Sequence, residues 1–595
     1  MLGGYAGKIL WVDLTENSCH SERLGEELAS NYLGGKGFGA HLLYHNQRPH
    51  TDPLSPDNLL IFATGPLTGT LAPSSAKSAL ITRSPLTRTF LDSYASGSFA
   101  SELKYAGYDI LVIKGRAQRP TYILIDDDSV SLRDASALWG LENADTARAI
   151  RAELGDERVK VISIGPAGER LVKFACVYCD RRTHGRGGGG AVMGSKNLKA
   201  IAVRGRGGIR IADLNRFDSA LQICLKRLAE KSTTFGKYGT LMTLSATNEA
   251  GVLPTRNWRE GYFEGADKIS AHRLYDEKLI RRVACFGCPV ACSRLSRGSY
   301  GGMPFTTEGP EYENVYAFGS NLGNPDLDSI LLAERLCDEY GLDTISCGVT
   351  IGFAMEAYEK GIISRADADG LELHFGNSRA AIELIQKIAR REGIGDLLAE
   401  GVKVASEKLG AGSSRFAMHI KGMELPAYDP RGMKGQALSY AVADRGGCHL
   451  RANTLKTEIW GSACDRFSYE GKARMVKELQ YQYIISDSSV LCLFINMGLE
   501  LDDYARLISS ATGLKLDREG LIAIADRIWQ LTRAFNCREG FGRADDTLPE
   551  RLFSDPLPSG ASKGEVVDRA SFEEMVEEYY RQEGWDLETG RPKFK

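Results

Sequence analysis

The chain has 595 residues, of which 43% are hydrophobic and 25% are charged, and its formal net charge is -3. This composition is ordinary for a folded globular protein of roughly three or four domains. It leaves no basic footprint for nucleic acid, and no apolar run approaches the roughly 20 residues of a membrane span. The first residues, MLGGYAGKILWVDL, lack the pattern of a signal peptide, so we expect a cytoplasmic protein.

Short apolar runs between turn signals dominate the first two hundred residues. Val, Ile, Thr and aromatic residues are frequent in these runs, as they are in strands. So many short strands favour an arrangement of two sheets or a barrel. The predicted strands cover residues 8–14, 59–65, 77–83, 109–115, 122–125, 159–164, 171–177 and 200–203.

Helical spacing replaces the strand pattern near residue 210, because apolar residues then recur three and four positions apart. The predicted helices cover residues 214–232, 329–340, 345–360, 379–391, 397–409, 472–485, 502–510 and 518–535. We therefore expect an α+β multidomain fold, with a β-rich domain over 1–210 and two mainly α-helical domains over 211–414 and 415–595.

The most specific local signal is Cys285-Phe-Gly-Cys288-Pro-Val-Ala-Cys292. Thiolates at this spacing can point at one centre, and iron–sulfur clusters are held in this way. A four-iron cluster needs a fourth thiolate, for which Cys337 and Cys492 are the candidates. The total of 13 cysteines is odd and the chain is long, which argues against a secreted disulfide framework.

Other interpretations of the cysteines remain open. Zinc sites usually combine two close pairs, and no second pair follows here. The three thiols can also belong to an ordinary core, whereas a radical enzyme using S-adenosylmethionine would show the reverse spacing, CxxxCxxC. Cys176 and Cys179 form a CxxC near a predicted strand and are expected to be packing residues. The isolated cysteines, including Cys448, are expected to be structural.

Two segments have the sequence of a helix end that can hold a polar ring. In Asp338-Glu-Tyr-Gly341-Leu-Asp343, Gly341 suits the left-handed position that ends a helix, and Asp343 or Thr344 can cap the next one. Asp487-Ser-Ser-Val490-Leu-Cys492 has the same outline, with Val490 in place of glycine. Each segment presents a carboxylate beside main-chain donors, although an ordinary helix cap would account for either one alone.

With these segments, the chain resembles the aldehyde:ferredoxin oxidoreductase family over nearly its whole length. Other stretches that resemble the family are 65–69, 102–109, 190–199, 308–313, 426–432 and 445–451. The resemblance implies a tungsten atom held by two pterins (tungsten bis-molybdopterin), a Mg²⁺ ion between the pterin phosphates and one [4Fe-4S] cluster. It also implies that the β-rich domain is a base of two sheets on which the pterins lie, covered by the two helical domains.

The resemblance assigns ligands residue by residue. The family's cysteine motif and the cysteine of its second DxxGL(D/C) motif hold the cluster, which here are Cys285, Cys288, Cys292 and Cys492. The residues assigned to the pterins, their phosphates and magnesium are Lys77, Ser93, Tyr94, Ala95, Arg182, Gly185, Arg186, Gly187, Asp338, Gly341, Leu342, Asp343, Arg451, Asp487 and Leu491. The glycine run 187–190 is typical of a nest of main-chain donors for an anion.

Three positions depart from the family pattern. Lys77 stands where the family often has Arg, so positive charge is kept without the bidentate fork. Tyr94 stands where the family often has an Asn that is linked to magnesium, which puts ligation at that position in doubt. Val490 replaces the glycine of the second motif, and we expect it to weaken the geometry of that helix end.

Glu313 and His449 are the candidate catalytic residues. The resemblance implies that an aldehyde is oxidised to an acid, in a reaction that can also run in reverse. The electrons pass through the cluster to ferredoxin or a polyferredoxin-like subunit. Glu313 would act as a general base on water and His449 would polarise the carbonyl oxygen, whereas a solvated acidic stretch and a structural histidine are the plain alternatives. Relatives often form homodimers or larger complexes.

Other functions remain open at this stage. Within the family, the substrate can instead be a hydroxy acid, with molybdenum as the metal, or an aryl-CoA. Outside it, the chain can be an electron-transfer subunit with a cluster and no catalytic metal, or a zinc-stabilised scaffold. Metal and pterin analysis separates these classes.

Overall fold

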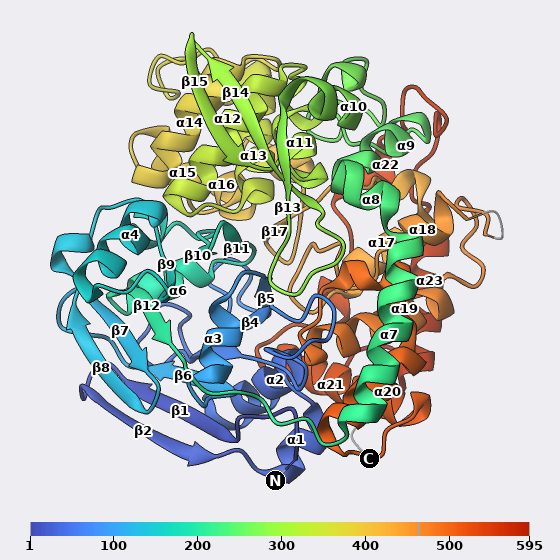
Figure 1. Cartoon of the computed structure of the whole chain (residues 1–595). Helices are drawn as coiled ribbons and strands as arrows, with labels where there is room; N and C mark the ends of the chain where they lie inside the picture. Colours follow the sequence, from blue (N-terminus) through green and yellow to red (C-terminus); the bar gives the residue numbers. More distant parts are fainter. Residues whose placement is uncertain (1, 462–463, 594–595) are drawn as a thin grey trace.

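The computed structural model describes residues 2–461 and 464–593. Figure 1 shows a β-rich N-terminal part, coloured blue to teal, below a helical middle part in green and yellow. The orange and red C-terminal helices lie beside both parts. The predicted order of two sheets followed by mainly helical segments is therefore confirmed.

The first sheet has six strands in the order β2-β1-β6-β3-β4-β5. β1 and β6 are parallel, and the other neighbouring pairs are antiparallel. Every position of β3 and β4 is buried. The bounds are β1 Lys8–Asp13, β2 Ser18–Arg23, β3 Leu60–Ala63, β4 Ser78–Arg83, β5 Phe90–Ala95 and β6 Ile110–Lys114.

The second sheet also has six strands, in the order β11-β10-β9-β12-β7-β8. Its one parallel pair is β12 with β7. The bounds are β7 Thr121–Asp126, β8 Ser129–Asp134, β9 Lys160–Ser163, β10 Val177–Cys179, β11 Arg182–His184 and β12 Leu198–Arg204.

The two sheets share one core. Leu60 and Leu80 of the first sheet and Ile123 and Ile201 of the second belong to a single buried cluster, completed by α3 Phe99–Tyr105 and α6 Gly189–Ser195. Helices cover the opposite faces: α1 Glu26–Tyr32, α2 Gly35–Asn46 and α21 Arg518–Arg538 on the first sheet, and α4 Asn143–Leu154 on the second. Because both faces of the central strands are covered, those strands have continuous apolar sequences.

The middle of the chain is helical except for one three-stranded antiparallel sheet. Its strands are β13 Leu279–Val283, β14 Ser293–Tyr300 and β15 Met303–Glu308, and the loop between β13 and β14 contains the three clustered cysteines. The helices of this part are α7 Leu214–Lys231, α8 Thr233–Tyr238, α9 Thr243–Glu249, α10 Ala271–Arg273, α11 Tyr312–Phe318, α12 Leu327–Tyr340, α13 Thr344–Glu359, α14 Ser378–Arg390, α15 Ile394–Leu398 and α16 Val402–Leu409.

The C-terminal part packs its longest helices against the N-terminal domain. α19 Lys472–Ser489 contacts α2, α17 Lys434–Val442, α21 and α23 Arg569–Glu583. The second helix-end motif, at the end of α19, is thereby brought next to the first sheet. The remaining helices of this part are α18 Leu455–Glu458, α20 Leu501–Thr512 and α22 Glu550–Ser554. None of the helices in the described ranges is both long and apolar enough to cross a bilayer.

Two predicted elements are wrong. Segment 171–177 is not a strand, because Leu171 takes a left-handed φ of 59° and the chain turns until β10 begins at Val177. The predicted helix over 397–409 is divided between α15 and α16, because Gly401 takes a φ of 87° between them. The three-stranded sheet was not predicted, since its strands are rich in polar residues and lack a continuous apolar run.

Candidate functional site

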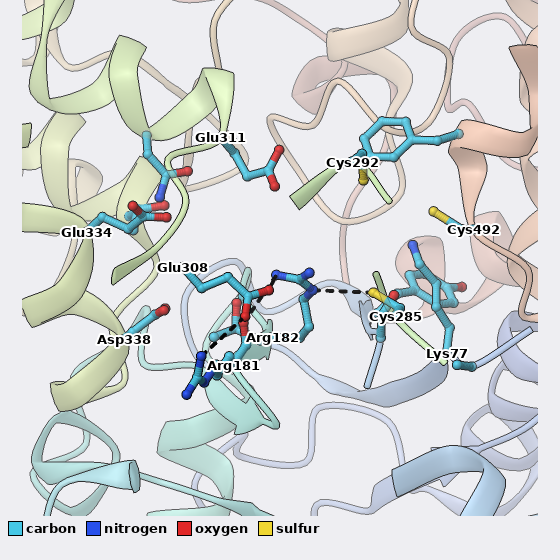
Figure 2. Close-up of a pocket in the computed structure, with 18 of the residues that line it drawn as sticks. Lys77, Arg181, Arg182, Cys285, Cys292, Glu308, Glu311, Glu334, Asp338 and Cys492 are labelled. Atoms are coloured by element: carbon cyan, nitrogen blue, oxygen red, sulfur yellow. Dashed lines mark hydrogen bonds and ion pairs between the residues drawn. The ribbon is translucent and has the colours of Figure 1, made fainter. Parts of the chain in front are cut away.

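The four candidate cluster cysteines line one cavity of about 260 Å³ between the N-terminal domain and the two helical parts. Cys285, Cys288 and Cys292 come from the β13–β14 loop, and Cys492 caps the short helix that follows α19. Segments about two hundred residues apart therefore supply thiols to the same space. Figure 2 shows Cys285, Cys292 and Cys492 on one side of this cavity, with Lys77 beside them.

Ser74 joins the two cysteine segments. Its N–H donates to the carbonyl oxygen of Gly287 at 3.0 Å, and its own carbonyl oxygen accepts from the N–H of Cys492 at 3.2 Å. Its hydroxyl lies 3.2 Å from the Cys288 sulfur. Ser74 has a φ of 57°, an uncommon conformation for a residue other than glycine. In this conformation its main chain forms hydrogen bonds with both cysteine segments.

Burial raises the pKa of the Cys492 thiol, and the nearby Cys288 and Cys285 raise it further, while Lys77 lowers it. Burial, Glu311, Cys492 and Cys288 raise the pKa of Cys292 in the same way. The thiols are thus close enough to oppose one another's ionisation, so a cationic centre bound among them would favour the thiolate form of each. Among the described residues, no three His, Cys, Asp or Glu side chains are arranged to hold a single metal ion.

Arg182 separates the sulfur-lined side of the cavity from an acidic side (Figure 2). Its Nε donates to the Cys285 sulfur at 3.5 Å, and its Nη1 lies 2.6 Å from Glu308 Oε1. Beyond it, Glu311, Glu334 and Asp338 also line the cavity. Burial raises the pKa of Asp338 to about 7, although the charge of Arg182 acts in the opposite direction.

The first helix-end motif has the geometry that its sequence predicts. Gly341 ends α12 in the left-handed region, with φ 76° and ψ 52°. Asp343 caps α13 by accepting from the N–H of Ile345 at 3.1 Å, and it also accepts from the Ser346 hydroxyl at 2.6 Å. Asp338, Leu342 and Asp343 all line the cavity, so this motif presents carboxyl groups to it.

The second motif keeps the same helix end despite its valine. Val490 ends α19 with φ 57° and ψ 37°, close to the values of Gly341. A left-handed residue other than glycine costs about 1–2 kcal/mol, and the full burial of Val490 offsets this cost. The expectation that Val490 weakens the geometry is therefore wrong for the backbone conformation, because packing against Gly35 and Gly65 holds it in place.

A buried network of charges surrounds Asp487 in the last turn of α19. Arg451 Nη1 lies 3.2 Å from Asp487 Oδ2 and 2.9 Å from Asp92 Oδ2. Burial opposes ionisation of Asp92, but Arg451, Lys36 and Arg445 hold its pKa below the ordinary value. Burial raises the pKa of Asp487 to about 6, against the effect of Arg451.

Tyr94 belongs to the same network, because its hydroxyl donates to Asp92 Oδ2 at 2.7 Å. Lys36 pairs with Asp92 at 3.2 Å and also with Asp444. The sequence analysis did not single out Lys36, Asp92 or Asp444 as functional residues. The sequence feature that could have identified Lys36 is the run of glycines around it, Gly34-Gly35-Lys36-Gly37, at the start of α2.

Arg186 ties the three parts of the chain together. Its Nε donates to Asp343 at 3.1 Å, its Nη1 to the carbonyl oxygen of Gly447 at 2.7 Å and its Nη2 to that of Glu424 at 2.5 Å. The neighbouring Gly187 has a φ of 85° and is pressed against Leu91, where a β-carbon would approach to 2.2 Å. This loop fixes the domain interface beside the first motif.

Glu313 and His449 lie next to each other and are largely buried. Glu313 Oε1 is 3.6 Å from His449 Nε2, and Glu313 Oε2 accepts from the N–H of Ala427 at 3.0 Å. Burial raises the pKa of Glu313 to about 8, and burial together with Arg186, Arg445 and Arg451 holds the pKa of His449 far below 6.5. At neutral pH the imidazole is therefore neutral and most of the carboxyl is protonated.

Cys448 is buried with its sulfur against the guanidinium group of Arg445, whereas the sequence predicted only a structural cysteine. Its sulfur accepts from Arg445 Nε at 3.2 Å, from Arg445 Nη2 at 2.9 Å and from the N–H of Leu450 at 3.3 Å. Burial raises its pKa, but Arg445, Arg451 and Arg186 reverse this and leave the pKa below the ordinary value. The signal was available in the sequence, where the cysteine stands between two arginines and next to His449.

Most of the predicted site residues fall on one cavity or its immediate surroundings. Those that line the cavity are Lys77, Tyr94, Arg182, Gly185, Cys285, Cys288, Cys292, Asp338, Leu342, Asp343 and Cys492. Those that do not are Ser93, Ala95, Arg186, Gly187, Glu313, Gly341, His449, Arg451, Asp487 and Leu491. Hydrogen bonds link Arg186 to Asp343 and to Ser93, and Arg451 to Asp487.

Thiols, buried carboxyl groups and buried guanidinium groups around one interdomain cavity are the donor set of a cofactor-dependent oxidoreductase. Two family models of aldehyde ferredoxin oxidoreductase match the chain: that of the N-terminal domain over residues 9–205, and that of domains 2 and 3 over residues 220–595. The chain therefore belongs to the aldehyde ferredoxin oxidoreductase family.

Individual relatives agree with this assignment. The tungsten-containing aldehyde ferredoxin oxidoreductase of Pyrococcus abyssi (strain GE5 / Orsay) is 43% identical over 599 residues, which cover 99% of this chain and 97% of that protein. An aliphatic sulfonate oxidoreductase, WOR-like subunit, from Pyrococcus furiosus (strain ATCC 43587 / DSM 3638 / JCM 8422 / Vc1) is 33% identical over 623 residues, which cover 99% of this chain and 96% of that protein. A family of tungsten-containing enzymes implies a tungsten pterin cofactor.

A solved structure has the same fold. The active site complex BamBC of benzoyl coenzyme A reductase, in complex with 1,5-dienoyl-CoA, contains a chain with a TM-score of 0.85 and 27% sequence identity. The match covers 100% of this chain and 96% of that chain. The fold is thus shared by relatives whose names state different substrates.

Proposed function

We propose that this chain oxidises aldehydes to carboxylic acids at a tungsten bis-pterin centre. Its electrons pass through a [4Fe-4S] cluster to ferredoxin or a polyferredoxin-like subunit. One observation carries the choice of reaction: relatives named tungsten-containing aldehyde ferredoxin oxidoreductase align with 99% of the chain at 42–43% identity. The names with other substrates belong to more distant proteins, at 33% and 27% identity.

The thiol side of the cavity fits a [4Fe-4S] cluster. A cubane takes one thiolate at each of four irons, and Cys285, Cys288, Cys292 and Cys492 are the thiols that share the cavity. The N–H and hydroxyl groups of Ser74 and the guanidinium group of Arg182 supply hydrogen bonds near these sulfurs. Hydrogen-bond donors beside the sulfurs tune the potential of a cluster.

Two buried carboxyl groups, Asp338 on the acidic side of the cavity and Asp487 in the charge network at the end of α19, fit the polar rings of two pterins. Asp338 and Asp487 are buried carboxyl groups with raised pKa values, so both gain from N–H donors that a pterin ring offers. Several buried polar atoms nearby have no hydrogen-bond partner within the described residues; they include Asp92 Oδ1, Glu313 Oε1, His449 Nδ1 and the hydroxyls of Ser488 and Ser489. Native interiors rarely leave so many polar atoms unpaired, which supports a polar ligand here.

Magnesium is part of the proposal as the ion between the two pterin phosphates. Mg²⁺ prefers oxygen ligands and retains several waters. The pterin phosphates can therefore supply the negative charge that the ion needs, with few ligands from the protein. The Tyr94 hydroxyl is already held by Asp92, so the phenol is a poorer candidate than an amide for this role. Lys77, beside Cys492, supplies positive charge to the same region.

The overall reaction is RCHO + H2O → RCOOH + 2 H⁺ + 2 e⁻. When bound, the tungsten pterin group supplies the two-electron acceptor, and the protein supplies position and charge. Glu313 Oε1, which has no hydrogen-bond partner among the described residues, accepts a proton from the attacking water. Neutral His449 donates its ring N–H to the carbonyl oxygen, and the buried ring of Tyr428, 5.7 Å from the imidazole, helps to exclude bulk water.

The decisive experiment uses anaerobically purified holoenzyme. Metal and pterin analysis is expected to give about one tungsten, four irons and two pterins per chain. A panel of aliphatic and aromatic aldehydes should then reduce benzyl viologen. Molybdenum with activity on hydroxy acids, or reduction of aryl-CoA without aldehyde oxidation, would favour the alternative members of the family. Zinc alone would exclude the proposal.

The Glu313→Gln variant tests the base at the level of one side chain. We expect it to keep its tungsten, iron and pterin and to lose at least a hundredfold in turnover, as general bases contribute. Glu583→Gln is the matched control, because Glu583 is also a buried carboxyl with a raised pKa but lies in α23 among Tyr481 and Gln530. Unchanged turnover in a fully loaded Glu313→Gln enzyme would rule out the base assignment.

The remaining features of the proposal concern the organisation of the protein. We propose domains over 1–210, 211–414 and 415–595, a cytoplasmic location, and assembly as a homodimer or with an electron-transfer subunit. Limited proteolysis of the holoenzyme, fractionation and mass measurement under native conditions test these points separately.

A further inference from the structure

The loop that supplies three of the thiols carries exposed apolar side chains. Phe286 lies between two of the cysteines and is 45% exposed, and Leu71, from the loop before β4, is 78% exposed. Ser74 N–H donates to the Gly287 carbonyl oxygen, and a β-carbon on Gly287 would lie 3.9 Å from the Ala72 carbonyl oxygen. The two apolar side chains therefore flank a single contact between the two loops.

Positive charge borders this apolar pair. Arg282 lies in β13, just before the cysteine loop, and is exposed. Arg282 Nη2 donates to the carbonyl oxygen of Val290 at 3.0 Å, so it folds over the loop. Lys237, near the end of α8, is also exposed and adjoins Arg282 through Gly236, where a β-carbon would lie 2.5 Å from Arg282 Nη2.

Arg282 and Lys237 form no salt bridge with a carboxylate among the described residues, whereas Arg182 is paired with Glu308. Lys237 lies over the rings of Tyr238 and Tyr275, at 4.8 and 4.7 Å from their centroids. We call Leu71, Lys237, Arg282 and Phe286 the thiol-loop face. A chain with a net charge of -3 thus presents two cations without a carboxylate partner among the described residues beside the loop of its clustered thiols.

We propose that the thiol-loop face docks a small acidic iron–sulfur electron carrier. An apolar centre rimmed by unpaired cations is complementary to an acidic surface with an apolar spot, and it steers such a partner at a rate that depends on salt. Transient redox complexes bury little surface, so two exposed apolar anchors with a charged rim are sufficient. In each encounter the carrier is reduced by one electron and the reduced cluster is oxidised, so two encounters follow each aldehyde. The inference rests on the proposed function, because it assigns the partner of the same site.

The test uses the holoenzyme and a purified, strongly acidic [2Fe-2S] ferredoxin as the probe. Benzyl viologen, a small dye that needs no docking surface, reports the aldehyde reaction independently. Leu71→Ala, Phe286→Ala and Lys237→Glu are expected to raise the KM for ferredoxin about tenfold each, which corresponds to about 1.4 kcal/mol, while the viologen rate stays unchanged. Met303→Ala is the matched control, because Met303 is 73% exposed at the turn between β14 and β15 and lies outside the face.

Salt and charge provide a second readout. The wild-type KM for ferredoxin should rise with ionic strength, and Lys237→Glu should flatten that dependence. A basic carrier such as cytochrome c should respond to Lys237→Glu in the opposite direction. If Phe286→Ala also reduces the iron content, Leu71→Ala decides, since Leu71 lies on a different loop from the three cysteines.

Two results would overturn the inference: an unchanged KM for ferredoxin in all three variants, or a change of oligomeric state in Leu71→Ala, which would make the face a contact between copies of this chain. Failure of the proposed function is distinguishable, because aldehydes would then not reduce viologen. In that case, reduction of ferredoxin by holoenzyme reduced with dithionite still tests the docking surface without any aldehyde.

Discussion

The pH dependence of turnover gives the most demanding test of Glu313. Burial raises the pKa of its carboxyl to about 8, because no compensating cation contacts it directly and the N–H of Ala427 supplies its single hydrogen bond. A general base must be ionised to act. With a pKa of about 8, roughly one tenth of the enzyme is ionised at pH 7 and nine tenths at pH 9. We therefore expect kcat/KM to rise about ninefold over that interval.

The assay measures kcat/KM for an aldehyde with benzyl viologen between pH 6 and pH 10, with tungsten and iron contents determined for each preparation. Glu313→Gln should lose both the activity and this rising limb, whereas Glu583→Gln should keep both. Anionic groups of a bound cofactor would move the limb further upward and not downward, because a negative charge opposes ionisation of the carboxyl. A rate that is flat from pH 6 to pH 9, or a rising limb that survives in Glu313→Gln, would refute the reasoning.

Three further predictions concern the cluster, the interdomain packing and the stability of the fold. Cys492→Ser should lower the iron content well below that of the wild type, while Cys537→Ser, a thiol outside the cavity, should not; equal iron in both would remove Cys492 from the ligand set. Gly35→Ala should lower the melting temperature and the tungsten content. Gly35 has a φ of 38°, and a β-carbon there would lie 2.2 Å from a main-chain oxygen of the second motif. Gly25→Ala is the control and should match the wild type, because a β-carbon at Gly25 would have no atom within 4 Å. Burial raises the pKa of Glu583 to about 7, so the free energy of unfolding of the wild type should fall by up to about 3 kcal/mol as the pH rises from about 4.5 to 7. Denaturant titrations at several pH values should show a weaker pH dependence for Glu583→Gln. An identical pH dependence in both proteins would contradict the shift.

The strands that the sequence predicts well are those with a continuous apolar run. β3, β6 and β12 are buried on both faces over most of their length and consist mainly of apolar residues, so their signal is strong. β13–β15 have one face toward solvent and several polar residues, so the same criterion misses them. The error at 171–177 has a different cause, because a left-handed residue at Leu171 interrupts an apolar segment without any glycine or proline to announce it.

The site residues also divide into those that the sequence predicts and those that it does not. The spacing of Cys285, Cys288 and Cys292 fixes three thiols on one loop by local geometry alone, and the caps at Gly341 and Asp343 follow from helix-end rules that act within a few residues. These features were accessible to sequence reasoning because each depends on neighbours in the chain.

The tertiary structure decided everything that depends on distant segments meeting. It selected Cys492 over Cys337 as the thiol in the cavity, since α19 packs on α2 and delivers its end to the N-terminal domain, while Cys337 lies buried in α12. It also placed Ser74 between the two cysteine segments. The sequence by itself determined the residue types and the local turns; long-range packing determined which of them share one cavity, because the free energy of burying them together involves elements hundreds of residues apart.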